Sequence, residues 1–365
     1  MSNIKSKDSV AKYKVIGLMS GTSLDGLDIA LCVFNKHETG KWSFSIEIAE
    51  TIRYAKNWQK LLSSAHQVKA EELLILNTAY GRLIGEEVTN FIAKNKIKGV
   101  DFIASHGHTI FHQPQKGFTF QLGNGNALHQ ASNLPTIWDF RTMDVALGGE
   151  GAPLVPIGDQ LLFADYDVCL NLGGIANLST EQKSKRIAYD ICYTNMTLNY
   201  LAQKNNKAFD KNGGMASDGQ VHVGLLKALS KVYATLRKPR PSLSREIFEK
   251  QIKPLLDNEK INLKDRLRTV TESMAAEIIS AIGTEKEKNV LITGGGAHNS
   301  FLLYRLVELG GDQLRFIKPD DPIVNFKEAL VFAFLGVLKV RGEENVLKSV
   351  TGALKNSSSG VMTGF

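Results

Sequence analysis

The chain has 365 residues, enough for two domains with separate cores, and its composition of 43% apolar and 22% charged residues is typical of globular proteins. The net charge of +7 is spread along the chain, and its densest basic run, 237–241, is short and interrupted by proline. Nothing in this pattern favours a nucleic-acid partner.

Three further features bear on location. Three cysteines without paired spacing argue against a disulfide or zinc framework and favour a reducing compartment. The N-terminus lacks an apolar signal core, and the longest apolar run, 329–338, is far shorter than the ~20 residues of a membrane helix. The sequence therefore predicts a cytoplasmic protein that does not bind membranes.

The first predicted element is a glycine-rich hairpin. Residues 14–16 have the pattern of a strand, and residues 27–34 alternate as in a second strand. The turn between them exposes successive backbone N–H groups, which suit phosphate oxygens. Asp25 and Asp28 are placed to hold Mg²⁺ beside a nucleotide, and Asp25 is the predicted metal ligand. The predicted nucleotide-binding residues of the hairpin are Gly21, Thr22, Ser23, Leu24, Asp25, Gly26, Leu27 and Asp28.

This turn is not a P-loop, because it lacks Gly-Lys-Ser/Thr and is followed by a strand where a P-loop is followed by a helix. It resembles the first phosphate loop of the sugar kinase, hsp70 and actin superfamily. An ordinary glycine-rich hairpin is the alternative for this stretch alone.

The later elements follow the same order twice. The first half continues with a strand at 42–48, a long helical pattern at 73–91 and a strand at 100–105. The second half shows strands at 168–172, 175–178, 186–189, 289–293 and 314–317, and helical patterns at 221–236, 244–256, 262–283 and 325–340. We predict two RNase H-like α/β domains that flank a cleft. The first spans 1–135 and regains the tail, about 345–365, and the second spans 136–344.

Residues 138–156 form a loop rich in functional side chains. Arg141 offers a planar fork that suits a carboxylate, and Asp144 offers an acceptor for sugar hydroxyls. A charged inter-domain linker is the alternative. Upstream, His106 and His108 share one strand face, but no neighbouring ligands complete a metal site, so we interpret them as site or core histidines.

Other candidates lie at the ends of predicted elements. Asp190 ends the strand 186–189, where a catalytic carboxylate belongs in such a sheet, although a lone Asp there is often a turn former. Glu328 begins an apolar helix, and its favourable interaction with the helix dipole explains it fully unless it faces the cleft. Further predicted nucleotide-binding residues are the turn glycines Gly173, Gly174, Gly294, Gly295 and Gly296.

Together these segments resemble the anhydro-N-acetylmuramic acid kinase family. The matching motifs occur in family order and span nearly the whole chain: 17–28, 105–114, 139–156, 171–177, 294–299, Glu328-Ala with Phe332-Ala, and 350–353.

The resemblance implies an ATP- and Mg²⁺-dependent homodimeric cytoplasmic kinase of cell-wall recycling. It would hydrolyse the 1,6-anhydro ring of 1,6-anhydro-N-acetylmuramic acid and phosphorylate O6, giving N-acetylmuramic acid 6-phosphate. The family's catalytic aspartate, the general base for the attacking water, falls on Asp190. We assign four residues to the sugar: Arg141, Asp144, Asn195 and Glu328.

The chain departs from the family after Asp190. The family usually reads Thr-Gly-Pro-Gly-Asn there, whereas this chain reads Ile191-Cys-Tyr-Thr-Asn195. We expect Cys192, Tyr193 and Thr194 to redirect this loop and weaken nucleotide binding. A catalytically weak sugar- or nucleotide-binding homologue, or a kinase for a related anhydro-sugar, is therefore the alternative. A dehydrogenase is disfavoured, because no Gly-x-Gly-x-x-Gly follows a strand and opens a helix.

Overall fold

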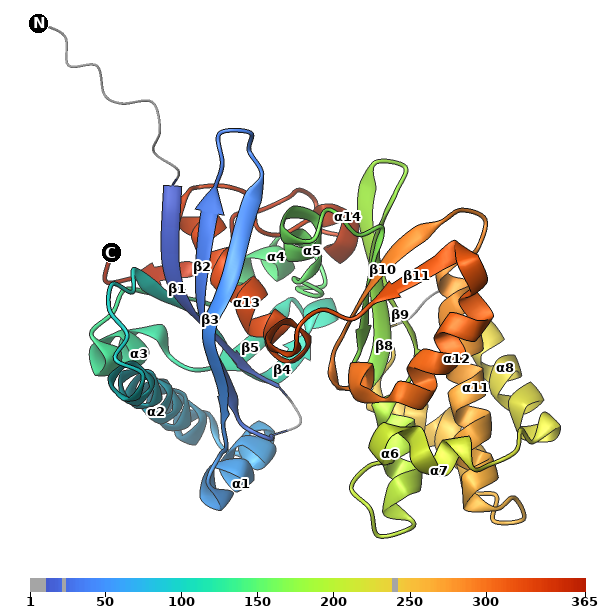
Figure 1. The fold of residues 1–365 in the computed structure, drawn as a ribbon. Helices are drawn as coiled ribbons and strands as arrows, with labels where there is room; N and C mark the ends of the chain where they lie inside the picture. Colours follow the sequence, from blue (N-terminus) through green and yellow to red (C-terminus); the bar gives the residue numbers. More distant parts are fainter. Residues whose placement is uncertain (1–10, 22–23, 238–241) are drawn as a thin grey trace, which may run out of the picture. The chain divides into compact units, whose positions relative to one another are not determined.

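The computed structural model describes residues 11–21, 24–237 and 242–365 (Figure 1). They form two compact units, each described by itself below. Unit 1 comprises the chain up to Leu162 together with Phe326–Phe365, and unit 2 comprises Phe163–Asn325. The predicted domain limits differ from these units, because residues 136–162 and 326–344 belong to unit 1.

Unit 1 is built on a mixed β-sheet. Its strands lie in the order β12-β6-β4-β1-β2-β3, and β5 pairs with β4. The β1–β2 and β2–β3 pairs are antiparallel, whereas β1–β4 and β4–β6 are parallel. The strands are β1 (Ala11–Ser20), β2 (Leu27–Lys36), β3 (Trp42–Ile52), β4 (Phe102–Gln113), β5 (Phe118–Leu122), β6 (Thr136–Trp138) and β12 (Val361–Thr363).

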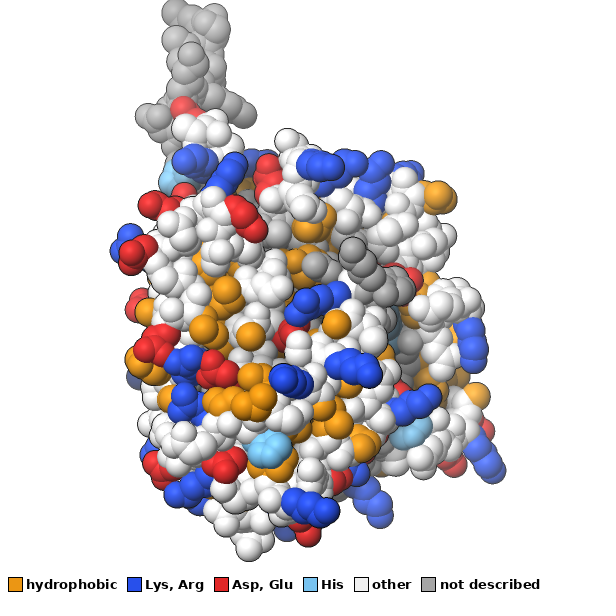
Figure 2. Space-filling model, turned by 90° about the vertical axis from the view of Figure 1, so that its right-hand side faces the viewer, with side chains coloured by type: hydrophobic (Ala, Val, Ile, Leu, Met, Phe, Trp, Pro, Cys, Tyr) orange, Lys and Arg blue, Asp and Glu red, His pale blue; other side chains and the backbone are white. Residues whose placement is uncertain are grey.

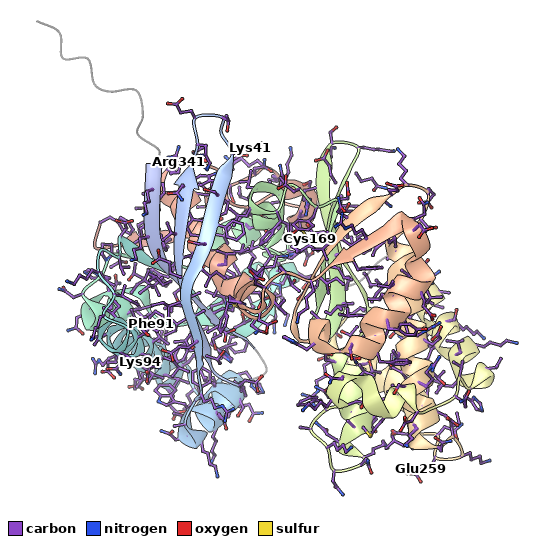
Figure 3. The ribbon with its side chains drawn as sticks, in the orientation of Figure 1. Lys41, Phe91, Lys94, Cys169, Glu259 and Arg341 are labelled. Carbon is purple, nitrogen blue, oxygen red and sulfur yellow. The ribbon has the colours of Figure 1, made fainter. Side chains whose placement is uncertain are left out.

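Helices cover both faces of this sheet. The long helix α2 buries Tyr80, Ile84 and Phe91 against β1 and β2, as its three- and four-residue apolar spacing predicts (Figures 1 and 3). On the other face α13 (Asp321–Val340) approaches β1 so closely that a Cβ on Gly17 would lie 2.0 Å from the Ala329 carbonyl oxygen. The α-helices of unit 1 are α1 (Lys56–Ser64), α2 (Ala70–Lys94), α3 (Gly125–Ser132), α4 (Thr142–Ala146), α5 (Pro156–Leu162) and α14 (Lys348–Thr351).

Unit 2 repeats the arrangement. Its sheet has the order β11-β10-β7-β8-β9, with β7–β8 and β8–β9 antiparallel and β7–β10 and β10–β11 parallel. Read from β3 in unit 1 and from β9 in unit 2, with the first five strands on each path numbered along the chain, both sheets have the order 3-2-1-4-5. The strands are β7 (Val168–Leu172), β8 (Ile175–Gln182), β9 (Lys185–Tyr193), β10 (Lys288–Thr293) and β11 (Leu314–Ile317). The predicted repeat is confirmed.

Helices pack on the apolar face of the second sheet and share one core with it. They are α6 (Asn195–Gln203), α7 (Gly214–Ser217), α8 (Val223–Leu236), α9 (Arg245–Ile247), α10 (Lys253–Leu256), α11 (Leu263–Ile282) and α12 (Ser300–Gly310). The chain passes from unit 2 to unit 1 within α13 (Asp321–Val340), where Phe326 has non-helical backbone angles.

Several strands are longer than predicted, and two of them, β4 and β9, run past candidate site residues. Strand β4 continues through His106 and His108 to Gln113 instead of ending there. Strand β9 continues to Tyr193, so the prediction that a strand ends at Asp190 is wrong. The reason is a β-bulge: Asp190 lies opposite Asn177 and Cys192 lies opposite Ala176, so Ile191 is inserted and pairing resumes beyond it.

The surface agrees with the dispersed charge of the sequence. Figure 2 shows Lys and Arg side chains scattered over one face and interspersed with Asp and Glu. The basic run at 237–241 lies outside the described residues except for Arg237. Among the helices of the described segments, none is long and apolar enough to cross a bilayer.

Candidate active site

The first hairpin of unit 1 joins β1 to β2, which pair from Ala11 with Lys36 to Ser20 with Leu27. Thr22 and Ser23 lie outside the described residues. Leu24 has a left-handed backbone with φ 61°, and its N–H donates to the Gly21 carbonyl at 3.4 Å. A Cβ on Gly26 would lie 2.4 Å from the Ile52 carbonyl oxygen. Gly26 is therefore required by the close approach of the end of β3.

Two carboxylates flank this turn. Asp25 is exposed, and Asp28 is half-buried and accepts a hydrogen bond from the Thr51 hydroxyl at 2.5 Å. Burial raises the pKa of Asp28, the Thr51 hydrogen bond opposes this, and the negative charge of Asp25 raises the pKa further. The negative charges of the two acids therefore repel each other.

The hairpin fits a nucleotide-bound Mg²⁺ better than a protein-only metal cage. Within residues 11–21, 24–237 and 242–365, no group of three or more His, Cys, Asp or Glu side chains could hold a metal ion. Mg²⁺ in nucleotide sites usually takes one or two carboxylates and completes its octahedron with phosphates and water. Asp25 and Asp28 match that requirement.

A buried polar network underlies the start of the turn. Tyr54 donates its hydroxyl proton to Ser20 Oγ at 2.7 Å and lies 2.6 Å from the Tyr80 hydroxyl. Ser20 Oγ also lies 2.9 Å from Nδ1 of His108. Burial lowers the pKa of His108 to about 4, so it is neutral at pH 7. The network was not predicted, because it joins β1, β4, α2 and the end of β3, which no local sequence pattern connects.

Arg141 is held by a histidine and a carbonyl group. Its Nε and Nη2 donate to Nε2 of His106 at 3.1 and 2.9 Å, and its Nη1 donates to the Gly151 carbonyl at 2.6 Å. Nδ1 of His106 lies 2.9 Å from the Gly107 carbonyl, which fixes the proton on Nδ1 and leaves Nε2 as the acceptor. These contacts use three of the five guanidinium N–H groups, so one on each terminal nitrogen can serve a ligand.

The charges around Arg141 follow from its half-buried position. Burial lowers its pKa to about 10, and the carboxylates of Glu328 and Asp144 oppose this, so it stays protonated at neutral pH. Burial, followed by the charge of Arg141, lowers the pKa of His106 well below the usual range. Glu328 is solvent-accessible, but the surrounding protein raises its pKa while Arg141 lowers it. Arg141, the neutral His106 and Glu328 thus form one electrostatically coupled group in unit 1.

Asp144 has the contacts of a residue that shapes the loop. It is fully buried, its Oδ2 accepts from the Gly151 N–H at 2.8 Å, and its Oδ1 accepts from the Thr351 hydroxyl at 2.8 Å. A Cβ on Gly149 would lie 2.2 Å from Oδ2. Both oxygens are therefore engaged within the protein. Direct contact with a sugar stays a prediction.

In unit 2 the ends of the parallel strands β7 and β10 come together with the start of α6. The carbonyl of Gly173 accepts from the Thr194 hydroxyl at 2.7 Å, and the Asn195 side chain donates to the Leu172 carbonyl at 3.1 Å. The Gly174 carbonyl accepts from the N–H groups of Thr194 and Met196. The first turn of α6 is thus tied to the glycine turn.

The glycines of this region fall into two kinds. Gly294 has φ 81°, and a Cβ there would lie 2.5 Å from Oδ1 of Asn171, while one on Gly296 would lie 2.7 Å from Cβ of Leu172. Internal packing explains both. By contrast, a Cβ on Gly174 would meet nothing within 4 Å, and one on Gly295 only the Asn195 side chain at 3.6 Å. Gly174 and Gly295 leave room for a ligand close to the backbone.

Asp190 lies within β9 beside the bulge and is half-buried. Its Oδ2 accepts from the Leu243 N–H at 2.8 Å and from the Ser242 hydroxyl at 3.5 Å. Burial raises the pKa of Asp190, and these two hydrogen bonds oppose the rise. A carboxylate with a raised pKa is a stronger proton acceptor, as a general base requires. The contact of Leu243 and Ser242 with Asp190 was not predicted, because these residues lie more than fifty positions away in the sequence.

The sequence analysis expected the side chains after Asp190 to redirect the loop and weaken nucleotide binding, but the structure places them in the protein interior. Cys192, Tyr193 and Thr194 are fully buried. The Tyr193 ring packs against Phe248 at 5.4 Å, and its N–H donates to the Tyr233 hydroxyl at 3.2 Å. These residues belong to the core of unit 2, and this removes the reason for expecting a catalytically weak homologue.

The repeated 3-2-1-4-5 sheet, with a glycine turn in the first hairpin of each unit, defines the nucleotide-binding fold of the sugar kinase, hsp70 and actin superfamily. The sequence model described as anhydro-N-acetylmuramic acid kinase matches residues 13–364. The chain therefore belongs to the anhydro-N-acetylmuramic acid kinase family.

Relatives of that name agree over nearly full length. The protein from Sulfurimonas denitrificans is 32% identical, with 95% of this chain and 98% of that protein covered. The protein from Aliivibrio fischeri is also 32% identical, with 96% and 98% covered. Among solved structures, the activator of the 2-hydroxyisocaproyl-CoA dehydratase from Clostridium difficile with bound ADPNP is 13% identical with a TM-score of 0.42, covering 90% of this chain and 97% of that chain.

Proposed function

We propose that this chain is an ATP-dependent kinase that opens the 1,6-anhydro ring of 1,6-anhydro-N-acetylmuramic acid and phosphorylates O6. The observation that carries the proposal is the match of residues 13–364 to the kinase family, supported by relatives that align over nearly their whole length. The product, N-acetylmuramic acid 6-phosphate, would serve the recycling of cell-wall sugars.

Asp190 is the proposed general base. It takes a proton from water as the water oxygen attacks the anomeric carbon, the bond from that carbon to O6 breaks, and O6 takes the γ-phosphoryl group of ATP, leaving ADP. Burial raises the pKa of Asp190, which strengthens it as an acceptor, and the Leu243 N–H holds one oxygen so that the other can face water. Among the carboxylates of the proposed site residues, we assign proton transfer to Asp190 alone.

The first hairpin and the glycine turns are proposed to bind ATP. Backbone N–H groups of Gly21 to Asp28 would contact phosphate oxygens, and Gly173, Gly174 and Gly294 to Gly296 would line the nucleotide. The free space around Gly174 and Gly295 supports this. When bound, Mg²⁺ would neutralise phosphate charge, and Asp25 would hold it with Asp28 nearby.

Arg141, Asn195 and Glu328 are proposed to bind the sugar. One free N–H on each terminal nitrogen of Arg141 gives the two-pronged geometry that suits the carboxylate of a muramic acid. Glu328 and Asn195 offer acceptors and a donor for hydroxyl groups. Asp144 would act through the loop, by fixing Gly151 and thereby the carbonyl that orients Arg141.

We also infer a cytoplasmic homodimer. The family resemblance supports both properties, and the burial of all three cysteine thiols accords with a reducing compartment. Light scattering coupled to size-exclusion chromatography measures the oligomeric state directly, and a monomer at micromolar concentration would contradict the dimer.

The test of function is an assay with purified protein, ATP, Mg²⁺ and 1,6-anhydro-N-acetylmuramic acid, with the product identified by mass. We expect ATP consumption that depends on the sugar, and a product that has gained one water and one phosphoryl group. Parallel reactions with N-acetylmuramic acid and with other anhydro-sugars test the substrate. Faster turnover of another anhydro-sugar would correct the substrate and leave the kinase activity in place.

A further inference from the structure

The segment that hydrogen-bonds the Asp190 carboxylate, residues 242–244, is distant from it in the sequence. The carboxylate accepts its shortest hydrogen bond from the N–H of Leu243, 53 residues further along the chain. Ser242 is exposed and reaches Asp190 only at 3.5 Å, whereas Leu243 is buried. Holding this carboxylate in one orientation therefore requires a fixed position for residues 242–244.

Tyr193 fixes that segment. Its hydroxyl donates to the Ser244 carbonyl at 2.7 Å, and the same carbonyl accepts from the Phe248 N–H at 3.2 Å. Ser244 also caps α9, because its Oγ accepts from the Ile247 N–H at 3.4 Å. The ring of Tyr193 is fully buried against Phe248, so the hydroxyl has little freedom to move. A large, buried side chain thus anchors the segment whose residues Ser242 and Leu243 touch Asp190.

We propose that Tyr193 is a positioning residue, which holds residues 242–244 so that the Leu243 N–H stays on the Asp190 carboxylate. Both ends of this arrangement come from one strand, because Tyr193 follows Asp190 by three residues across the bulge at Ile191. The side chain that departs from the family pattern therefore supports the site from within the core. The catalytic consequence rests on the proposed role of Asp190, but the structural one does not.

The charged surroundings of Asp190 make this testable by titration. Burial raises the pKa of Tyr193 in β9, and the negative charges of Asp190 and of Glu246 in α9 raise it further. From β8, the residue opposite Asp190 is the uncharged Asn177. From the 242–244 segment, Leu243 and Ser242 donate hydrogen bonds that lower the pKa of Asp190. Loss of the Leu243 bond should therefore raise that pKa.

The first experiment compares Tyr193→Phe with a matched control. Tyr193→Phe keeps the buried ring and removes only the anchoring hydroxyl, so the protein should fold. We expect the acid limb of kcat/KM to move up by about one pH unit, the size expected for one lost hydrogen bond to a charged group. Well above this limb, kcat should stay within a few-fold. The control Tyr233→Phe removes a buried hydroxyl that contacts the Tyr193 N–H, and should leave the limb in place.

A second measurement separates this proposal from the proposed function. The pKa of Asp190 can be followed by NMR in protein labelled with ¹³C at aspartate carboxyl groups, with the signal assigned from Asp190→Asn. A higher Asp190 pKa in Tyr193→Phe, but not in Tyr233→Phe, supports the positioning role even if Asp190 proves not to be the base. An unchanged Asp190 pKa in Tyr193→Phe overturns the positioning role, even if Asp190→Asn abolishes turnover.

Discussion

The two units contain the same sheet but different first hairpins. In unit 1 the turn between β1 and β2 spans residues 21–26 and is followed at once by Asp28. In unit 2 the turn between β7 and β8 is only Gly173 and Gly174, and its carbonyls are tied to the start of α6. The longer turn contains the exposed carboxylate of Asp25, whereas the shorter turn consists of two glycines and contains no carboxylate.

The third strands also differ, but here it is unit 2 that carries the candidate site residue. Strand β3 ends at Ile52, and the close packing of Gly26 on its last carbonyl serves the hairpin. Strand β9 instead carries the half-buried Asp190 beside a bulge, and a second segment clamps its carboxylate. The comparison teaches that the same sheet carries different side chains in the two units, for which we propose a cation site in unit 1 and a base in unit 2.

The largest predicted effect concerns the base in unit 2. Asp190→Asn should lower kcat by ~10²–10⁴, because a positioned general base contributes on that scale. The KM for ATP should change little, because the Asp190 carboxylate is hydrogen-bonded by Leu243 and Ser242, which are not among the residues proposed to bind ATP. Steady-state kinetics on protein with wild-type circular dichroism tests this. Near-normal turnover by the folded variant would remove Asp190 from the proton transfer.

The segment after Asp190 should behave as core. Replacing Cys192-Tyr193-Thr194 by Gly-Pro-Gly should lower the free energy of unfolding by at least ~3–5 kcal/mol, the usual range for deleting a buried aromatic side chain. Urea denaturation measures this, with Tyr193→Phe as the control that should lose only ~1 kcal/mol. Unchanged stability combined with tighter ATP binding would restore the idea that these side chains hinder the nucleotide.

A pair of glycine substitutions tests which turns are structural. Gly294→Ala should destabilise the protein by ~1–3 kcal/mol, because its φ of 81° and the 2.5 Å approach of Asn171 exclude a side chain. Gly174→Ala should change stability by less than ~0.5 kcal/mol and should weaken only nucleotide binding. Thermal unfolding with and without ATP distinguishes them. Equal losses of stability would show that open space around Gly174 has no functional meaning.

In unit 1, Asp25→Asn should raise the KM for Mg²⁺-ATP about tenfold, equivalent to ~1.4 kcal/mol, and leave sugar binding nearly unchanged. The matched control is Glu259→Gln, which removes one exposed negative charge in unit 2 and leaves unit 1 unchanged. Titration of ATP at several Mg²⁺ concentrations measures the effect. A similar change in both variants would mean that only net charge matters.

The smallest effect is on stability as a function of pH. The folded-state pKa of Asp190 is raised, so its contribution to stability is full below the unfolded-state pKa, about 3.9, and is lost as pH rises through the folded-state value. Asp190→Asn should therefore be as stable as wild type or more stable at pH 7, and this advantage should vanish below pH 4. A variant clearly less stable than wild type at pH 7 would contradict the direction.

The sequence predicted the strands and helices whose limits follow from the local spacing of apolar residues. Alternation placed β7 and β11 at their observed limits, and three- and four-residue spacing placed α2 and α11 within a few residues. The repeat of elements in the two halves was also predicted, because equivalent patterns recur in order, whereas the 3-2-1-4-5 strand order comes from the structure. The end of β9 was missed, because a bulge at Ile191 lets a strand continue past a polar residue.

Site contacts were harder to predict than elements. The sequence drew attention to Arg141 and Asp190, but their roles stay predictions. It did not reveal that His106 holds Arg141 or that Leu243 holds Asp190, since these pairs are 35 and 53 residues apart. Nor did it show that Asp144 is fully buried. Such contacts arise from tertiary packing, which no periodicity encodes.

The most direct test of the account is the product formed by wild type and Asp190→Asn from ATP and 1,6-anhydro-N-acetylmuramic acid, measured by mass spectrometry in a time course. We predict that wild type forms a sugar phosphate that has gained one water, and that Asp190→Asn forms the same product at least ~10²-fold more slowly. A phosphorylated sugar that retains the anhydro bridge, or equal rates for the two proteins, would contradict the account.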